Sequence, residues 1–217
     1  RVPAIVEGWL LGQAGGPALA DVLFGVVNPS GRLAETIPVK LEDAPSHLFF
    51  PGDETGVRYG EGLFVGYRGY DASGTAVAFP FGHGLSYTTF AYGEAEATAS
   101  EGGIRVQVQV TNTGERTGRE VVQAYVSLPG SKVVRVPREL KAFASVELAP
   151  GASQVVSLQI GHSVGDGLQV IEQSYRQIQR RAKLRLIYLP RHIDAHRAPI
   201  HYRPRRTEHA ARRLPAL

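Results

Sequence analysis

The chain has 217 residues and a formal net charge of +4, with 43% hydrophobic and 20% charged residues. This composition is typical of a globular protein with one large or two small domains, and it excludes a collagen-like or wholly disordered chain. The sequence contains no Cys, which excludes disulfides, thiolate metal ligands and a Cys nucleophile. No apolar run reaches the roughly 18–20 residues that span a bilayer, and no signal peptide precedes the first apolar run. These features fit a soluble protein, either cytoplasmic or secreted.

The first 41 residues combine a strand pattern with a helix pattern. Residues 2–10, VPAIVEGWL, form an apolar run typical of a buried parallel strand, and the Gly-rich turn GQAGG follows it. Helical spacing begins near Pro17 and ends at Gly25, and residues 32–39 alternate like a further strand. A lone strand, helix and strand cannot cover both faces of their own sheet. We therefore expect residues 1–41 to close an α/β sheet whose other strands lie earlier in a longer chain.

Residues 42–91 are rich in Gly and Pro and show no regular period, apart from the strand-like LFVGYRGY at residues 63–70. Flexible linkers are poor in aromatic residues, whereas this segment is rich in them. We therefore expect an ordered connector whose rings are buried against neighbouring domains. In AFPFGHGLSYTTF, residues 78–90, we expect the rings to fill a seam between two domains and the glycines to allow close backbone approach. The aromatic residues of the connector are Phe49, Phe50, Tyr59, Phe64, Tyr67, Tyr70, Phe79, Phe81, Tyr87 and Phe90.

Residues 92–160 carry the signals of an all-β sandwich. The strand patterns are IRVQVQVTN, EVVQAYVSL, LKAFASVEL and SQVVSLQI, and turns rich in Gly and Pro separate them. In the first pattern, Ile104, Val106, Val108 and Val110 alternate with polar residues, so we expect these side chains to face the core. A sandwich of this kind needs about seven strands. Since only four or five are recognisable, we expect the sandwich to be incomplete.

Residues 161–217 form a basic tail. Residues 1–160 hold 12 Lys and Arg against 16 Asp and Glu, a net charge of −4, whereas the tail holds 12 against 4, a net charge of +8. Clustered Arg favours nucleic acid, and His192, His196 and His201 suggest a metal site. We favour a different interpretation, a frameshifted or altered terminus, because the sandwich pattern stops partway and gives way to Arg, His and Pro. The tail is then disordered and leaves a sheet edge open.

Five segments of the chain form a specific combination: PAIVEGWLLGQAGGPALADVLFGVVNPSGRLAETIP, YGEGLFVGYRGYD, FPFGHGLSYTTF, VTNTGERTGREVVQAYV and PRELKAFASVELAPGAS. Together they resemble the C-terminal part of glycoside hydrolase family 3, the β-glucosidase and β-xylosidase group. The resemblance covers about residues 1–160 in the family's order. It implies an α/β plus all-β architecture. Residues 1–41 would end an α/β sandwich domain, residues 42–91 would connect it to the next domain, and residues 92–160 would form a fibronectin type III-like β-sandwich.

The resemblance also implies hydrolysis of terminal β-linked sugars with retention of configuration, by two carboxylates about 5–5.5 Å apart. The family's nucleophile is an Asp on a TIM-like barrel, and its acid/base is usually a Glu upstream of EGWLLGQAGG. Neither motif occurs in this chain, so no catalytic residue is assigned and the chain alone is expected to be inactive. We expect no cofactor and no metal. The implied partner is a β-linked oligosaccharide or glycoside held by the missing barrel, and we expect neither nucleic acid nor a membrane. The alternative function is a non-catalytic accessory module that binds carbohydrate or docks onto a separately encoded barrel.

Two residues are weak candidates for substrate contact. The carboxylates Glu7, Asp21, Glu35 and Glu61 each have a structural explanation, and only Glu7 is kept as a candidate contact at the rim of a sugar site. Trp9 is kept because an aromatic ring stacks on the apolar face of a sugar, and it is the only Trp.

The remaining polar motifs have structural explanations. GQAGG lacks the Lys and Ser or Thr that follow a phosphate-binding loop, so phosphate binding is not expected. Ser86 lies in no G-x-S-x-G elbow, and His83 is expected to be a structural hydrogen-bonding residue. Glu61 is expected to bond to the backbone or to Arg58 or Arg68.

Overall fold

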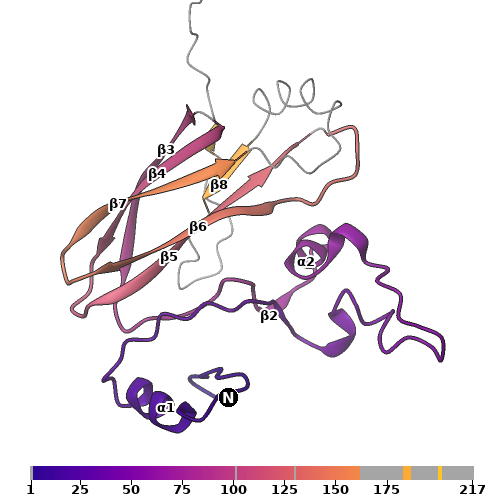
Figure 1. Cartoon of the computed structure of the whole chain (residues 1–217), viewed down its shortest axis with the longest axis horizontal. Helices are drawn as coiled ribbons and strands as arrows, with labels where there is room; N and C mark the ends of the chain where they lie inside the picture. The colour runs from indigo at the N-terminus through magenta and orange to yellow at the C-terminus, as the bar shows by residue number, and fades with distance from the viewer. Residues whose placement is uncertain (1, 101, 130, 162–182, 187–199, 202–217) are drawn as a thin grey trace, which may run out of the picture.

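The computed structural model of the chain describes residues 2–100, 102–129, 131–161, 183–186 and 200–201. It contains a two-layered β-sandwich and an elongated N-terminal part that runs along one side of the sandwich (Figure 1). The N-terminal part holds the helices α1 and α2 and the short strand β2, all on the same side of the sandwich. The chain therefore separates into a layered β domain and a thinner segment that precedes it.

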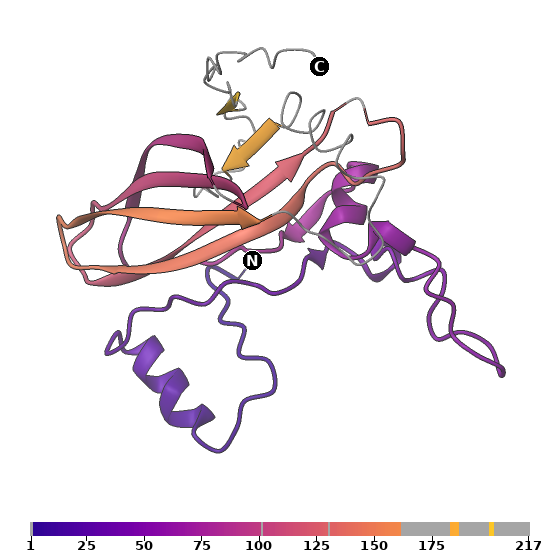
Figure 2. The same ribbon diagram turned by 45° about the horizontal axis from the view of Figure 1, so that its top comes forward.

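The sandwich consists of two antiparallel sheets. In one sheet the order is β3, β4, β7, with the bounds Phe90–Ser100, Gly103–Asn112 and Ser153–Gly161. In the other the order is β6, β5, β8, β9, with the bounds Glu139–Leu148, Gly118–Ser127, Lys183–Leu186 and Ile200–His201. Figure 2 shows the two layers from a second angle. The predicted β-sandwich is confirmed.

The core lies between the two sheets and follows the alternation of the sequence. Val106, Val108 and Val110 are 0%, 2% and 0% exposed, as predicted for one face of β4. Ile104 is half-buried and packs against the same cluster. The register places Val108 opposite Val156 of β7. Burial of each such side chain contributes on the order of 1.5–3 kcal/mol. The other core residues are Phe90, Val122, Ala124, Val146, Leu148, Leu158 and Ile160.

One edge of β5 pairs with strands that the sequence patterns do not show. β8 lies antiparallel to β5, with Ala124 opposite Leu186, and β9 pairs with β8. Both short strands come from the segment 161–217, in which no strand was expected. The other residues of this segment, among them His192 and His196, lie outside the described residues. The prediction that the tail is frameshifted or disordered also falls mostly on residues outside the described ones.

The start of the chain contains the predicted helix but not the predicted strand. α1 (Gly15–Leu23) has Pro17 in its first turn, and Gly25 follows its end with φ = +73°, the left-handed conformation that favours Gly there. Residues 2–10 form no strand. A parallel strand needs neighbouring strands to bond its backbone, and none of the described residues pairs with this segment. Its apolar side chains are exposed accordingly; they are Val2, Ile5, Val6, Trp9 and Leu10.

Residues 37–79, which include much of the connector, form short elements. In chain order they are β1 (Ile37–Pro38), the 3-10 helices η1 (Leu41–Asp43) and η2 (Gly62–Phe64), α2 (Tyr67–Ser73) and β2 (Val77–Phe79). β1 and β2 pair antiparallel. The prediction of a strand at residues 63–70 is wrong, because this stretch contains the end of η2 and the start of α2. Helical spacing puts Tyr67 and Tyr70 on one face, where Tyr70 is 7% exposed.

Candidate functional site at the seam between connector and sandwich

The candidate carboxylates lie on separate parts of the N-terminal segment. Glu7 precedes α1, Asp21 lies on α1, Glu35 precedes β1 and Glu61 precedes η2. Glu7, Asp21 and Glu35 are exposed, whereas Glu61 is half-buried. A retaining glycosidase needs two carboxyl groups that face each other across a sugar site. Nothing in the placement of these four side chains assigns them that role.

Glu7 and Trp9 are neighbours in an exposed turn. The Trp9 backbone N–H donates to Glu7 Oε1 at 2.8 Å, and Trp9 adopts φ = +50°, which is uncommon for a residue other than Gly. The Trp9 side chain is 56% exposed. Both candidate contact residues are therefore accessible at the start of the chain.

The hydrogen bonds of Glu61 differ from those that the sequence predicts. Its Oε2 is buried and has no hydrogen-bond partner among the described residues. The expected bond to the backbone, to Arg58 or to Arg68 is therefore absent for this oxygen among the described residues. The Glu61 backbone carbonyl accepts a hydrogen bond from the Phe64 N–H at 2.9 Å.

The segment that precedes the connector pairs with the C-terminal part of the connector beside the sandwich. The Leu33 N–H donates to the His83 carbonyl, and the Gly82 N–H donates to the Leu33 carbonyl, both at 2.8 Å. A Cβ on Gly82, which has φ = +81°, would lie 2.7 Å from the side-chain amide of Gln123. A Cβ on Gly84 would lie 2.2 Å from the Gly31 carbonyl oxygen, in the segment that precedes the connector. The glycines of FPFGHG are therefore needed for close approach, as predicted.

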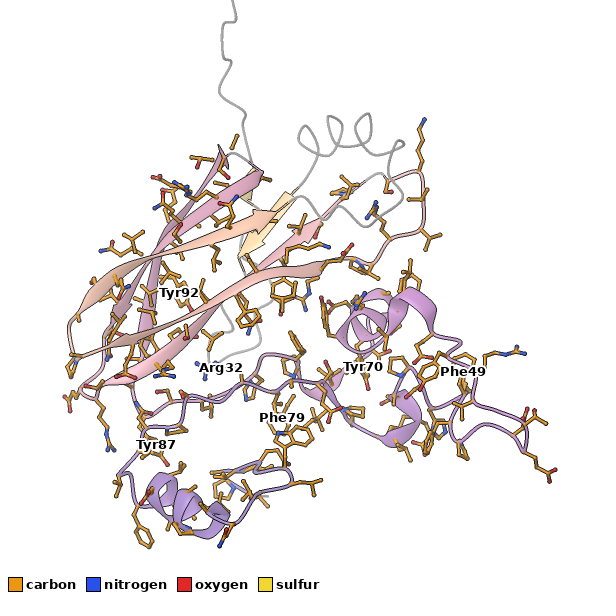
Figure 3. All side chains as sticks on the ribbon, viewed as in Figure 1. Arg32, Phe49, Tyr70, Phe79, Tyr87 and Tyr92 are labelled. Carbon is orange, nitrogen blue, oxygen red and sulfur yellow. The ribbon has the colours of Figure 1, made fainter. Side chains whose placement is uncertain are left out.

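Asn28 joins three segments at one point. Its Nδ2 donates to the Thr117 carbonyl at 2.9 Å. Its Oδ1 accepts bonds from the Ser86 hydroxyl at 2.9 Å and the Tyr87 N–H at 2.8 Å. The Tyr87 hydroxyl donates to the Val22 carbonyl at 2.8 Å, so α1 is tied to the same point, and Figure 3 shows Tyr87 beside this helix. Ser86 is thus a structural residue.

Arg32 and Glu120 form a largely buried ion pair between the segment that precedes the connector and β5. Arg32 Nη2 lies 2.9 Å from Glu120 Oε2, and each side chain is only 12% exposed. Arg32 Nη1 also donates to the carbonyls of Ser30 and Gly31, and Glu120 Oε1 accepts from the Val121 N–H. Buried ion pairs are favourable only when their other polar atoms are satisfied as well. Figure 3 shows Arg32 next to the sandwich.

A second ion pair holds α2 against the sandwich. Arg138 binds Asp71 through two bonds, Nε to Oδ2 at 2.5 Å and Nη2 to Oδ1 at 2.9 Å. Such bidentate pairs are stronger and more specific than single contacts. The Arg138 guanidinium also lies 5.3 Å from the centre of the Tyr125 ring, within range of a cation–π interaction. Nearby, the Leu140 N–H donates to the Tyr67 hydroxyl at 2.8 Å.

Aromatic rings pack beside the Arg138–Asp71 pair. The Tyr67 ring stacks on Phe81 at a centroid distance of 4.9 Å and meets Tyr125 edge-on at 5.9 Å. The predicted place of Phe81 in the seam is confirmed, whereas Phe90 belongs to the sandwich core. Burial raises the pKa of Tyr125 well above its ordinary value, so the hydroxyl is neutral and donates to Gln123 Oε1 at 2.6 Å.

A hollow of about 60 Å³ lies where α2 meets the seam. Sites for small molecules usually enclose about 300–1,000 Å³, so this hollow has room for a few water molecules and none for a sugar. Two of its charged groups, Asp71 and Arg138, are already bonded to each other. It is therefore a gap in the packing of the seam. The lining residues are Thr36, Tyr67, Tyr70, Asp71, Thr75, Val77, Pro80, Phe81, Tyr125 and Arg138.

His83 makes the seam sensitive to acid. Burial first, and the nearby Arg32 second, lower the pKa of His83 below its ordinary value of 6.5. The unfolded chain therefore binds this proton more readily than the folded chain. Stability from this group is complete above about pH 6.5 and is lost as the pH falls through the lower folded-state pKa. We expect the urea midpoint to decrease between pH 7.5 and pH 5, and His83→Gln to reduce that slope. Equal slopes for both proteins would contradict this expectation.

Other kinds of site are absent from the part of the chain that the structure describes. No group of three or more His, Asp or Glu side chains there could hold a metal ion. The helices α1 and α2 have nine and seven residues, and no described helix is long and apolar enough to cross a membrane.

The two ion pairs of the seam and the bonds of Asn28 were not predicted from the sequence. Arg32 and Glu120 are 88 residues apart, and Asp71 and Arg138 are 67 residues apart. Local spacing carries no signal for pairs at such separations. Asn28 begins the turn NPSG, which indicated a turn but not the three segments that Asn28 joins.

Comparison with protein families gives two matches. Residues 1–87 match the glycosyl hydrolase family 3 C-terminal domain, and residues 120–164 match the fibronectin type III-like domain. Between them lies the first half of the β-sandwich, up to the start of β5. The two matches agree with the α/β end and the sandwich that the sequence indicates.

Individual relatives share the same region. The thermostable β-glucosidase B of Acetivibrio thermocellus is 51% identical over 164 residues, which cover 74% of this chain and 22% of the relative. The exo-α-(1→6)-L-arabinopyranosidase of Bifidobacterium longum is 50% identical, over 72% of this chain and 21% of the relative. Among solved structures, a family 3 β-glucosidase of Bifidobacterium adolescentis has a TM-score of 0.68 at 49% identity, with 71% of this chain and 23% of that chain covered. The chain thus spans about a fifth of the length of the relatives it matches.

Proposed function

We propose, because this chain belongs to glycoside hydrolase family 3 and corresponds to its C-terminal part, that it is the structural end of a retaining β-glycosidase. It holds the end of an α/β domain and a β-sandwich in a fixed relation, and it has no hydrolytic activity alone. The observation that carries this proposal is the seam. Its polar side chains bond to other residues of the same chain, through the ion pairs of Arg32 and Arg138 and the hydrogen bonds of Asn28.

The chemistry of the whole enzyme lies outside this chain. The four candidate carboxylates lie on separate parts of the N-terminal segment, and the hollow described at the seam is too small for a sugar. The named relatives are β-glucosidases and an arabinopyranosidase, so the substrate class that we propose is a terminal glycoside, with β-linked glucosides first. We propose that the sugar is held by the preceding part of the enzyme, and that neither nucleic acid nor a membrane is a partner.

Glu7 and Trp9 remain candidates for contact with that sugar. Both are exposed and lie together at the start of the chain. This is the end of the chain that would be nearest in sequence to the missing catalytic part. Their proposed role is to bound the rim of the site, without any part in bond cleavage.

Two assays on aryl β-glucosides test the proposal. The purified chain is expected to show no turnover. A chimera, in which the whole of this chain replaces the matching C-terminal segment of the Acetivibrio thermocellus enzyme, is expected to be active, since the two are 51% identical over that segment. Turnover by the isolated chain, or a folded but inactive chimera, would contradict the proposal.

The alternative function, an accessory module that binds polysaccharide, is less well supported. Such modules usually display a row of exposed aromatic rings. In the described part of the sandwich, Phe90 and Tyr125 are buried, Tyr92 is half-buried, and Phe143 alone among the Phe and Tyr side chains is exposed. Retardation of the purified chain in an affinity gel that contains insoluble glucan would restore this alternative.

A further inference from the structure

Exposed apolar side chains are concentrated before the sandwich. Of the 24 large apolar side chains that are exposed among the described residues, 20 lie in residues 2–87 and four in the sandwich. Soluble proteins rarely leave large apolar areas uncovered. The crowded part is the same stretch that matches the family 3 C-terminal domain. This part of the chain therefore requires a covering that the described residues do not supply.

Residues 47–65, here called the arm, hold six of these side chains. The arm projects from α2 away from the sandwich in both views (Figures 1 and 2). Its exposed apolar side chains range from 44% to 87% exposed. They are Leu48, Phe50, Val57, Tyr59, Leu63 and Val65.

Local contacts give the arm a defined shape. At its tip, the Asp53 N–H donates to the Gly56 carbonyl at 3.0 Å. Asp53 Oδ1 accepts from the Thr55 N–H, the Thr55 hydroxyl and the Gly56 N–H at 2.8, 2.6 and 3.0 Å. Farther back, the Phe49 ring lies so close to Gly60 that a Cβ there would be 2.2 Å from it. The arm is therefore ordered without an apolar core of its own.

The base of the arm is fixed to the sandwich through α2. A Cβ on Gly69 of α2 would lie 2.3 Å from the Phe64 carbonyl oxygen and 2.8 Å from the Pro45 ring. The helix thus packs tightly against the chain at both ends of the arm. Its Asp71 forms the bidentate pair with Arg138 beside β6. The contacts of α2 therefore fix the position of the apolar arm relative to the sandwich.

We infer that the arm is a docking surface for the preceding part of a family 3 glycosidase, the part that supplies the catalytic groups. This inference rests on the proposed function. The chain covers 22% of the Acetivibrio relative, so about four fifths of such an enzyme lies outside it. The arm lies inside the stretch that matches the family's C-terminal domain, so we assign its partner to the rest of the same enzyme. It gives the catalytic part a second point of attachment, in addition to the exposed residues around α1.

Serine substitutions in the arm test the inference in the chimera defined above. Phe50→Ser and Tyr59→Ser remove rings that are 74% and 84% exposed in this chain, and Phe143→Ser removes a 69% exposed ring from β6 as the control. The arm variants are expected to lower the Tm of the chimera by about 3 °C or more, because the rings are buried there. Phe143→Ser is expected to leave it unchanged. In the isolated chain, none of the three variants should change the Tm.

Three results would overturn the inference. In the first, the arm variants behave like Phe143→Ser in the chimera. In the second, the isolated chain is a dimer in analytical ultracentrifugation and Tyr59→Ser makes it a monomer, because the arm then binds a second copy. In the third, the chimera shows no cooperative unfolding, because the two parts then do not fit. If the chimera is active and the arm variants leave its Tm unchanged, this inference is contradicted but the proposed function is still supported.

Discussion

Replacement of Glu120 by Ala is expected to destabilise the folded chain by about 3–5 kcal/mol. The change leaves the Arg32 guanidinium, in a side chain that is 12% exposed, without its carboxylate. It also removes the acceptor of the Val121 N–H. The cost is large because the remaining charge stays buried while its partner is lost. Urea unfolding followed by circular dichroism measures the change from the shift in midpoint.

Glu147→Ala is the matched control for this prediction. Arg119 and Glu147 join the neighbouring strands β5 and β6 at 3.2 Å, but their side chains are 54% and 59% exposed. Exposed pairs contribute about 0–1 kcal/mol, so the control should lose less than about 1 kcal/mol. The double variant Arg32→Met with Glu120→Leu should recover much of the loss, because it leaves no buried charge. Equal losses for Glu120→Ala and Glu147→Ala would show that the seam pair is open to water.

The parts of the fold that the sequence predicts are those whose information is local. Alternation along β4 is sufficient to place Val106, Val108 and Val110 in the core, because a strand turns every second side chain to the same face. The helix between Pro17 and Gly25 is predicted for a similar reason, since both of its end signals lie within it or next to it. Neither element depends on a distant residue for its type.

The wrong predictions concern elements whose type depends on distant partners. Residues 2–10 have the composition of a buried parallel strand, but a strand forms only where another strand bonds its backbone. Residues 63–70 have β-branched and aromatic residues typical of strands, yet the contact between Tyr67 and Phe81 favours the helix. Tertiary contacts override such local preferences. The same argument explains why β8, four residues long, carries no recognisable strand signal.

The sequence predicts where the candidate site lies, but it does not predict which residues bond to each other there. The density of rings and glycines in residues 78–90 indicates a tightly packed seam, and Gly82 and Phe81 lie in it. The sequence does not indicate the ion pair of the seam, because Arg32 and Glu120 resemble ordinary surface residues there. Their role follows only from burial, which depends on the whole fold. The resemblance to the family identifies the region, and the structure identifies the contacts.

The seam also explains why a C-terminal segment without catalytic groups would matter to an enzyme. Asn28, Arg32 and Asp71 lie before the sandwich, and each is bonded to a residue of the sandwich or its turns. Movement of the sandwich therefore moves the connector and α1. Rigid support of this kind positions neighbouring catalytic groups, and small misplacements of such groups are costly. The sandwich would thus act on catalysis through geometry alone.

Asn112→Leu is expected to destabilise the chain about as strongly as Glu120→Ala, by about 3–5 kcal/mol. Asn112 ends β4 and is 0% exposed. Its Nδ2 donates to the carbonyls of Arg116 and Leu148, both at 2.8 Å. Its Oδ1 accepts from the Thr88 hydroxyl at 2.6 Å and the Gly114 N–H at 3.1 Å. The full bonding capacity of the amide is used, so Leu, which is similar in size, leaves four polar groups without their partner.

Thr111→Val separates this effect from a general loss of polar groups on β4. The Thr111 hydroxyl bonds to the Ser153 hydroxyl at 2.7 Å, in an exposed position one residue away from Asn112. Since water replaces a lost partner at such a site, the variant should lose less than about 1 kcal/mol. Asn112 also fixes the turn that leads from β4 to β5, and Thr88 at the end of the connector is one of its partners. The Asn112→Leu variant should therefore unfold at lower urea and also show faster hydrogen exchange in residues 113–117. A variant with a normal urea midpoint would mean that these four bonds contribute no net stability to the sandwich.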